Sequence, residues 1–144
     1  MHPTTNSPAK FDAASHDLEK GSFDTRAFAL GDLNEDGYLD VIAGNHEALG
    51  KGYYFNGVDW SIRELSQGVT GPVHTVVTAD WDNDGDLDGL LGMDGKNHVL
   101  LKNNGGSSLV GTGSLLNNSV TRGMAIGDID GDGDLDLITA NFRS

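Results

Sequence analysis

The chain has 144 residues, a length that suits one compact domain, and 37% of them are apolar, enough to fill a modest core. Its 22 acidic residues outnumber the nine basic ones, and the resulting net charge of −13 argues against nucleic acid and anionic membranes as partners. The absence of cysteine excludes disulfides, thiolate nucleophiles and sulfur-ligated metals. No apolar run reaches the ~20 residues of a membrane helix, and residues 1–10 lack the apolar stretch of a secretion signal.

An internal repeat organises the chain. A nine-residue acidic segment occurs three times, at 32–40, 80–88 and 128–136, each copy starting 48 residues after the last. Apolar residues alternate in the stretches before these segments, at 25–31, 73–79 and 121–127, and again in the stretches 39–43 and 135–139. This period of two predicts one strand running into each acidic segment and another leaving it, so each acidic segment is a hairpin loop.

Further strands are expected after each hairpin. Residues 51–55 and 98–102 precede the dipeptides Asn56-Gly57 and Asn104-Gly105, which suit two-residue hairpin turns. Residues 60–65 and 108–116 are weaker fourth strands, and no segment shows helical periodicity with caps. The sequence therefore predicts an all-β fold with one four-stranded antiparallel unit per 48-residue period.

Such units are the blades of a β-propeller, which typically closes with 4 to 8 blades. Residues 22–144 hold three repeats, and the third stops after its second strand. In the N-terminal segment 1–21, residues 11–18 would supply a missing outer strand, in the same chain or in a neighbour. A homodimer would complete a six-bladed ring, whereas the alternative is a fragment of a longer parent.

The acidic loops carry oxygen ligands in a repeated pattern. Carboxylate or carboxamide oxygens stand at positions 1, 3, 5 and 9, a backbone carbonyl is available at position 7, and Gly37, Gly85 or Gly133 allows the sharp turn at position 6. Ca²⁺ takes 6 to 8 such oxygens and tolerates irregular geometry, so about three Ca²⁺ ions per chain are expected. The ligands are predicted to be Asp32, Asn34, Asp36, Tyr38 and Asp40 in the first loop; Asp80, Asp82, Asp84, Asp86 and Asp88 in the second; and Asp128, Asp130, Asp132, Asp134 and Asp136 in the third.

The charge of the loops predicts that metal binding and ordering are coupled. Fourteen of the 22 acidic residues lie in the three loops, and three Ca²⁺ ions would change the net charge from −13 to −7. Two carboxylates ~4 Å apart repel by roughly 4 kcal/mol at an effective dielectric constant near 20. The first loop has Asn34 where the others have Asp, so we expect weaker binding there. An EF-hand is excluded, because position 12 is Ala43, Leu91 or Thr139 instead of Glu.

Apolar residues at positions 2 and 8 of the loops are expected to pin them to the core. These residues are Leu33 and Leu39, Trp81 and Leu87, and Ile129 and Leu135. His74 takes the place of Arg26 and Arg122 in its repeat, which indicates a surface or inter-blade role. The five histidines share no metal-ligand spacing, and no triad or free acid pair is evident, so catalysis is not expected.

The repeated motif resembles the FG-GAP repeat of integrin alpha subunits and its bacterial VCBS relatives. The resemblance rests on D-x-[DN]-x-[DN]-G-x-x-D between two strands, preceded by Ala-Leu-Gly or Ala-Ile-Gly and followed by Leu-Asp-Val-Ile-Ala-Gly-Asn45 or Leu-Asp-Leu-Ile-Thr-Ala-Asn141. It implies a β-propeller, usually of seven blades, with Ca²⁺ in these loops and an extracellular or cell-surface role in adhesion or carbohydrate binding. The Phe-Gly and Gly-Ala-Pro signatures are absent, which favours the bacterial branch.

Three functional hypotheses follow. The first is a non-catalytic, calcium-binding module that binds a glycan or a protein; its candidate sugar-contacting residues are Trp60, Tyr53, Tyr54, Phe55 and His98, for which the alternative is edge-strand packing. The second is a purely structural scaffold that assembles by edge pairing. The third is an accessory module of an extracellular enzyme that acts on polysaccharides.

Overall fold

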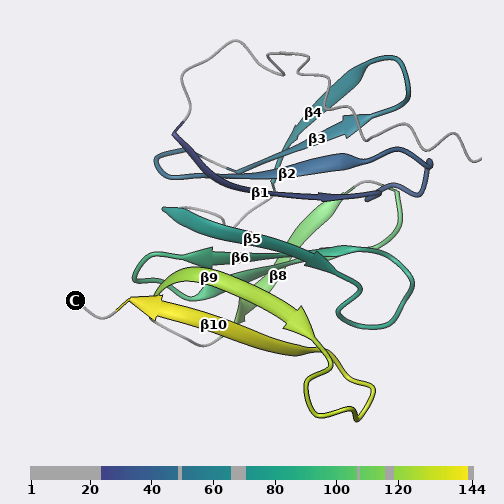
Figure 1. Ribbon diagram of the computed structural model, residues 1–144. Helices are drawn as coiled ribbons and strands as arrows, with labels where there is room; N and C mark the ends of the chain where they lie inside the picture. The colour runs from purple at the N-terminus through teal and green to yellow at the C-terminus, as the bar shows by residue number, and fades with distance from the viewer. Residues whose placement is uncertain (1–23, 49, 66–70, 107, 116–118, 143–144) are drawn as a thin grey trace, which may run out of the picture.

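The computed structural model describes residues 24–48, 50–65, 71–106, 108–115 and 119–142 (Figure 1). These residues form three antiparallel sheets, so the predicted all-β fold is confirmed. The expectation that residues 11–18 supply an outer strand lies outside the described residues. No helix in the described part is long and apolar enough to cross a membrane.

Each of the first two repeats forms a four-stranded meander. The first sheet has the order β1-β2-β3-β4, and the second has β5-β6-β7-β8. The third repeat gives a two-stranded sheet of β9 and β10, as its length predicts. The strands are β1 (Thr25–Gly31), β2 (Asp40–Asn45), β3 (Lys51–Phe55), β4 (Trp60–Glu64), β5 (Val73–Ala79), β6 (Asp88–Met93), β7 (His98–Asn103), β8 (Leu109–Leu115), β9 (Val120–Gly127) and β10 (Asp136–Phe142).

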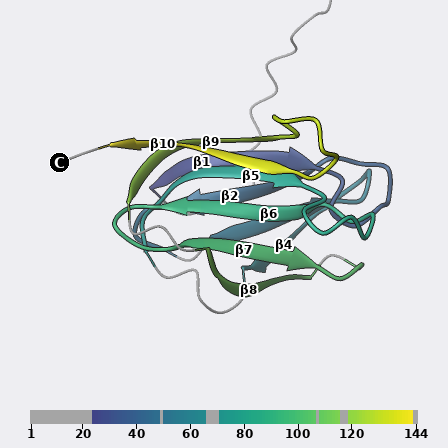
Figure 2. The same cartoon turned by 90° about the horizontal axis from the view of Figure 1, so that it is seen from below.

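The three sheets stack face to face like successive propeller blades, and in the described residues they form a stack without a closed ring (Figures 1 and 2). β5 lies between the first strands of the other two sheets, in contact with both β1 and β9. The main core fills the space between the first and second sheets. Its buried members include Leu33, Ile42, Tyr54, Val73, Val76, Leu91, Met93 and Leu101.

Strand β1 shows how the alternating pattern sets the faces of a blade. Ala27 and Ala29 pack against the core toward the second sheet. Phe28 and Leu30 point to the opposite face and are 68% and 52% exposed. The small residues allow the second sheet to approach closely, whereas the large ones have no covering partner among the described residues.

The two-residue hairpin turns predicted at Asn56-Gly57 and Asn104-Gly105 are wrong. Four residues, 56–59, separate β3 from β4, and five, 104–108, separate β7 from β8. A type I′ turn needs positive φ at both central residues. At the first turn only Gly57 has it, with a φ of 89°. The Asn56 side chain instead accepts hydrogen bonds from the backbone N–H groups of Val58 and Asp59, which widens the turn.

The prediction that all six apolar loop residues reach the core is also wrong. Leu33 is buried and Leu87 packs on the core, but Leu39 is 61% exposed and Ile129 is 60% exposed. The reason is the direction of stacking. Position 8 of a loop packs on the preceding sheet, as Leu87 does on Gly31, and Leu39 has no preceding sheet in the described chain. Ile129 likewise has no described sheet after it.

Candidate metal centres

All three acidic loops lie at the same end of the stacked sheets. They connect the first and second strands of each sheet, β1 to β2, β5 to β6 and β9 to β10 (Figures 1 and 2). Three acidic turns therefore project side by side from one end of the molecule.

The first Asp of each loop holds the turn in one repeated conformation. Asp32 accepts hydrogen bonds from the backbone N–H groups of Asp36 at 3.1 Å and Gly37 at 2.8 Å. Asp80 and Asp128 accept from the corresponding residues at 3.0 to 3.1 Å. The backbone at position 4 is left-handed in all three loops, at Glu35, Asn83 and Gly131, and so is the glycine at position 6.

The last Asp of each loop anchors the loop to the sheet. Asp88 is 3% exposed and accepts hydrogen bonds from the backbone N–H groups of Trp81 at 3.1 Å and Asn103 at 2.8 Å. Asp40, which is fully buried, is held in the same way by Leu33 at 3.0 Å and Phe55 at 2.9 Å. Burial raises the pKa of both carboxyl groups, and these backbone donors oppose the rise. The carboxylate at position 9 thus stabilises the packing of the loop on the sheet and is also a candidate metal ligand.

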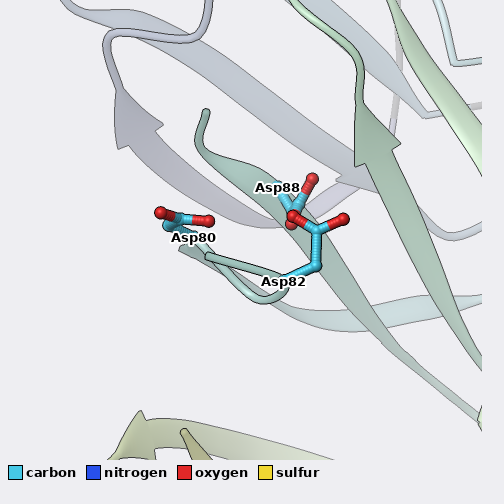
Figure 3. Close-up of side chains that lie close together, drawn as sticks. All are labelled: Asp80, Asp82 and Asp88. Carbon is cyan, nitrogen blue, oxygen red and sulfur yellow. The ribbon is translucent and has the colours of Figure 1, made fainter. Parts of the chain in front are cut away.

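Positions 1, 3 and 9 converge in the second and third loops. Asp80, Asp82 and Asp88 each offer one oxygen within 4.8 Å of the others, and Asp128, Asp130 and Asp136 do the same. Figure 3 shows the carboxylates of Asp82 and Asp88 side by side, with Asp80 facing them. Ca²⁺–oxygen distances are ~2.3 to 2.6 Å, so two oxygens on opposite sides of one ion lie ~4.6 to 5.2 Å apart. The spacing and the all-oxygen donor set therefore fit one Ca²⁺ ion in each of these two loops.

The other predicted ligands are placed differently. Asp84 and Asp132, at position 5, lie outside the two clusters and accept hydrogen bonds from the backbone N–H groups at position 7. In the first loop the side-chain amide of Asn34 donates a hydrogen bond to Asp36 at 3.0 Å. An amide therefore stands at position 3, where the other two loops have a carboxylate. The backbone carbonyls of Tyr38, Asp86 and Asp134 stay predicted ligands.

Sequence reasoning missed a lysine at the second loop. Lys102, on β7, forms an ion pair with Asp82 and lies 3.6 Å from a carboxylate oxygen of Asp84. The hydrogen bond from Lys102 lowers the pKa of the Asp82 carboxyl. The repeat pattern gives no hint of this contact, because the corresponding residue of the first repeat is Tyr54. Only the pairing of β7 with β6, which follows the loop, could have suggested it.

Most of the candidate sugar-contacting residues are not available to a ligand. Tyr53, Tyr54 and His98 are 8%, 4% and 1% exposed. His98 Nε2 lies 3.1 Å from the Thr121 hydroxyl, which itself donates to Asn141, so His98 links the second and third sheets. Trp60, by contrast, is 38% exposed and packs beside Phe55, with ring centroids 4.9 Å apart.

His74 has the inter-blade role that its position predicts. Its Nε2 lies 3.1 Å from a carboxylate oxygen of Asp94, in the loop after β6 of the same repeat. Its Nδ1 lies 3.0 Å from a guanidinium nitrogen of Arg122, on the third sheet, and its ring packs edge-on against His46 of the first repeat. One side chain therefore contacts residues of all three repeats.

Comparison with models of protein families identifies the repeat. A family model described as an FG-GAP-like repeat matches residues 32–91 and, in a second overlapping match, residues 80–139. Both matches begin at the first Asp of an acidic loop, and together they cover most of the chain. No curated protein matches the chain significantly. The repeated loops, the meander sheets and this match together show that the chain belongs to the FG-GAP-like repeat family.

Proposed function

We propose that the chain is a calcium-binding β-propeller module in which the ions stabilise the fold. The observation that supports this most directly is the convergence of three carboxylates, within 4.8 Å, in each of two loops. Two unit charges within that separation repel by at least about 3.5 kcal/mol at an effective dielectric constant of ~20. A divalent cation bound among them would replace this repulsion with attraction.

A bound Ca²⁺ ion would attract the carboxylates at both ends of each hairpin loop and so hold the two ends together. The second loop is also tied to the neighbouring sheet, because Asn103 donates from its backbone to Asp88 and from its side chain to the carbonyl of Leu33 at 2.6 Å. Ordering this loop around an ion would therefore also favour stacking of the first two sheets. In this role the ion is structural, and the module is non-catalytic.

The three loops are expected to bind Ca²⁺ unequally. The first loop has the amide of Asn34 in place of a carboxylate, so we propose that it binds most weakly. In the second loop, Lys102 already neutralises part of the charge of Asp82. The third loop has three carboxylates at positions 1, 3 and 9.

An extracellular role in binding a glycan or a protein is the second part of the proposal. The family resemblance supports it, and so does Trp60, a half-exposed aromatic residue stacked on Phe55. Such an aromatic surface suits the apolar face of a sugar or of a protein partner. A glycan array tests this part: reproducible binding that is lost in Trp60→Ala supports it, and an array without binding leaves the scaffold hypothesis.

Calorimetric titration of the EDTA-treated chain tests calcium binding. We expect about three Ca²⁺ per chain, and one fewer strong site in Asp130→Asn. This variant keeps the loop conformation, because Asn34 accepts the same backbone hydrogen bond at that position in the first loop. Asp59→Asn, an exposed change at the β3–β4 turn, is the matched control. An absence of binding heat in millimolar Ca²⁺, together with an unchanged melting temperature after addition of EDTA, would refute the proposal.

A further inference from the structure

Asn103, the last residue of β7, is hydrogen-bonded to both the first and the second acidic loop. It is 1% exposed, and its backbone N–H donates at 2.8 Å to Asp88, at position 9 of the second loop. Its side-chain amide donates to the backbone carbonyls of Leu33 at 2.6 Å and Leu87 at 3.2 Å. Leu33 stands at position 2 of the first loop, and Leu87 stands at position 8 of the second. One buried residue therefore joins the two loops.

The connection continues inside the first loop. The backbone N–H of Leu33 donates at 3.0 Å to Asp40, the carboxylate at position 9 of that loop. Asp40 and Asp88 are both candidate metal ligands, and Leu33 and Asn103 link them through hydrogen bonds. All four residues are at most 3% exposed, so this path is shielded from water. Hydrogen bonds in such a low-dielectric environment are stronger than hydrogen bonds at the surface.

The side-chain part of this link is not a general property of the repeat. The corresponding residue of the first repeat is Phe55, whose backbone N–H donates to Asp40 at 2.9 Å, as that of Asn103 does to Asp88. The ring of Phe55 packs against Tyr38 and makes no such link. A buried amide is costly unless it is hydrogen-bonded, and Oδ1 of Asn103 has no partner in the described structure. The two bonds to carbonyls are therefore what the amide contributes at this position.

We propose that Asn103 couples the two loops, so that Ca²⁺ binding in the second loop raises the Ca²⁺ affinity of the first. This inference rests on the calcium binding proposed above. An ion held by Asp88 would restrict the motion of Asn103 and, through its amide, of the Leu33 carbonyl. The first loop would then lose less conformational entropy when its own ion binds. By linkage, an ion in the first loop raises the affinity of the second by the same factor.

Electrostatic repulsion between the two sites predicts the opposite sign. An ion in the second loop makes that loop less negative, which weakens the attraction of the first loop for another cation. Salt screens this effect over a Debye length of ~8 Å at 0.15 M, whereas the buried hydrogen bonds are screened much less. Positive coupling at this ionic strength would therefore favour the hydrogen-bonded path over electrostatics.

An NMR titration with Ca²⁺ in 0.15 M salt measures each loop separately. The backbone N–H groups of Gly37, Gly85 and Gly133 each donate to the first Asp of their own loop, so each amide signal reports on one site. We expect the Gly37 midpoint to rise about two- to tenfold in Asp82→Ala, which removes a ligand of the second loop; this is the range of one hydrogen bond. Asp130→Ala, in the third loop, is the matched control and should leave the Gly37 midpoint unchanged, because β5 lies between β1 and β9.

The sign of the shift separates the two mechanisms. The empty second loop of Asp82→Ala keeps four carboxylates and a charge of −4, whereas the wild-type loop with Ca²⁺ has five carboxylates and a charge of −3. Electrostatics alone would therefore lower the Gly37 midpoint in this variant. A higher midpoint requires a coupling that outweighs the repulsion.

Asn103→Leu tests the path itself, because it removes the amide and keeps the backbone N–H. In this background Asp82→Ala should no longer raise the Gly37 midpoint. Thr78→Val is the matched control: it removes another hydrogen bond between the first two sheets, from Thr78 to the carbonyl of Leu30 at 3.1 Å, and should keep the coupling. Asn103→Ala makes the same comparison if the leucine variant does not fold. A merely structural Asn103 would change the melting temperature but not the shift caused by Asp82→Ala.

Three results would overturn the coupling while the proposed calcium binding stands. The first is a Gly37 midpoint that is equal or lower in Asp82→Ala, although all three glycines respond to Ca²⁺. The second is a shift that persists when the Asn103 amide is removed. The third is an equal shift in Asp130→Ala, which would show that the effect does not follow the Asn103 path. If no glycine responds in millimolar Ca²⁺, the proposed calcium binding is refuted, and the coupling with it.

Discussion

Asp88 and Asp82 lie in the same carboxylate cluster but differ in burial, and this difference can separate folding from metal binding. Asp88 is 3% exposed and accepts two backbone hydrogen bonds, from Trp81 and Asn103. Asp88→Ala leaves the buried N–H group of Asn103 and the part-buried N–H group of Trp81 without an acceptor, at about 1–3 kcal/mol each. We therefore expect the free energy of unfolding to fall by about 2–6 kcal/mol, a large part of the stability of a domain this size.

Urea unfolding in EDTA and in Ca²⁺ measures the two effects separately. Asp82 is exposed and accepts no buried backbone donor in the described structure, so Asp82→Ala should change stability little in EDTA. In Ca²⁺, both variants should lose the stabilisation that the ion gives the second loop, about 2.7 kcal/mol at a free concentration of 100 times Kd. Equal stability of Asp88→Ala and the wild-type chain in EDTA would refute the structural role of Asp88.

Three further predictions concern single side chains. Lys102→Met should raise the calcium affinity of the second loop, because Ca²⁺ no longer competes with the lysine ammonium group for Asp82. The expected gain is about two- to fivefold, the range of an exposed ion pair. Calorimetry showing an unchanged or lower affinity would contradict this. Gly44→Ala should lower the free energy of unfolding by about 1–3 kcal/mol, because the new Cβ would lie 2.4 Å from Val73 Cγ1, and an unchanged urea midpoint would count against it. Burial lowers the pKa of His98 from its usual 6.5, so the unfolded chain binds a proton that the folded chain excludes. Stability should therefore fall as the pH drops from about 6.5 through the lowered pKa, and His98→Asn should flatten this slope in urea titrations; an unchanged slope would show that His98 is not responsible.

The sequence predicts the repeat and its strands well because the signals for them are local. The predicted ranges agree with eight of the ten strands within two residues, β10 extends three residues beyond its predicted end, and the two-stranded third sheet follows from the length of the last repeat. The conformation of the loops is equally local. The first Asp accepts hydrogen bonds from residues four and five positions later, so the same short motif gives the same turn three times.

The candidate metal site could be predicted only in part. The pattern of Asp at positions 1, 3, 5 and 9 names the oxygens, but it does not show that positions 1, 3 and 9 converge while position 5 turns to the backbone. The pattern also gives no sign that Asp88 accepts a buried hydrogen bond, because the donor Asn103 is 15 residues away on another strand. Lys102 was missed for the same reason, because strand pairing brings it to the loop from 20 residues away.

By itself, the sequence determined the 48-residue period, the strands, the acidic turns and the membership of a repeat family. Tertiary structure decided which identical positions are buried. Leu87 packs on Gly31 while Leu39, at the same place in its own loop, is exposed, and Leu33 is buried while Ile129 is not. Local sequence fixes the direction in which a side chain leaves its strand, but burial requires a neighbouring sheet to cover it, and only the stacking of the sheets provides that neighbour.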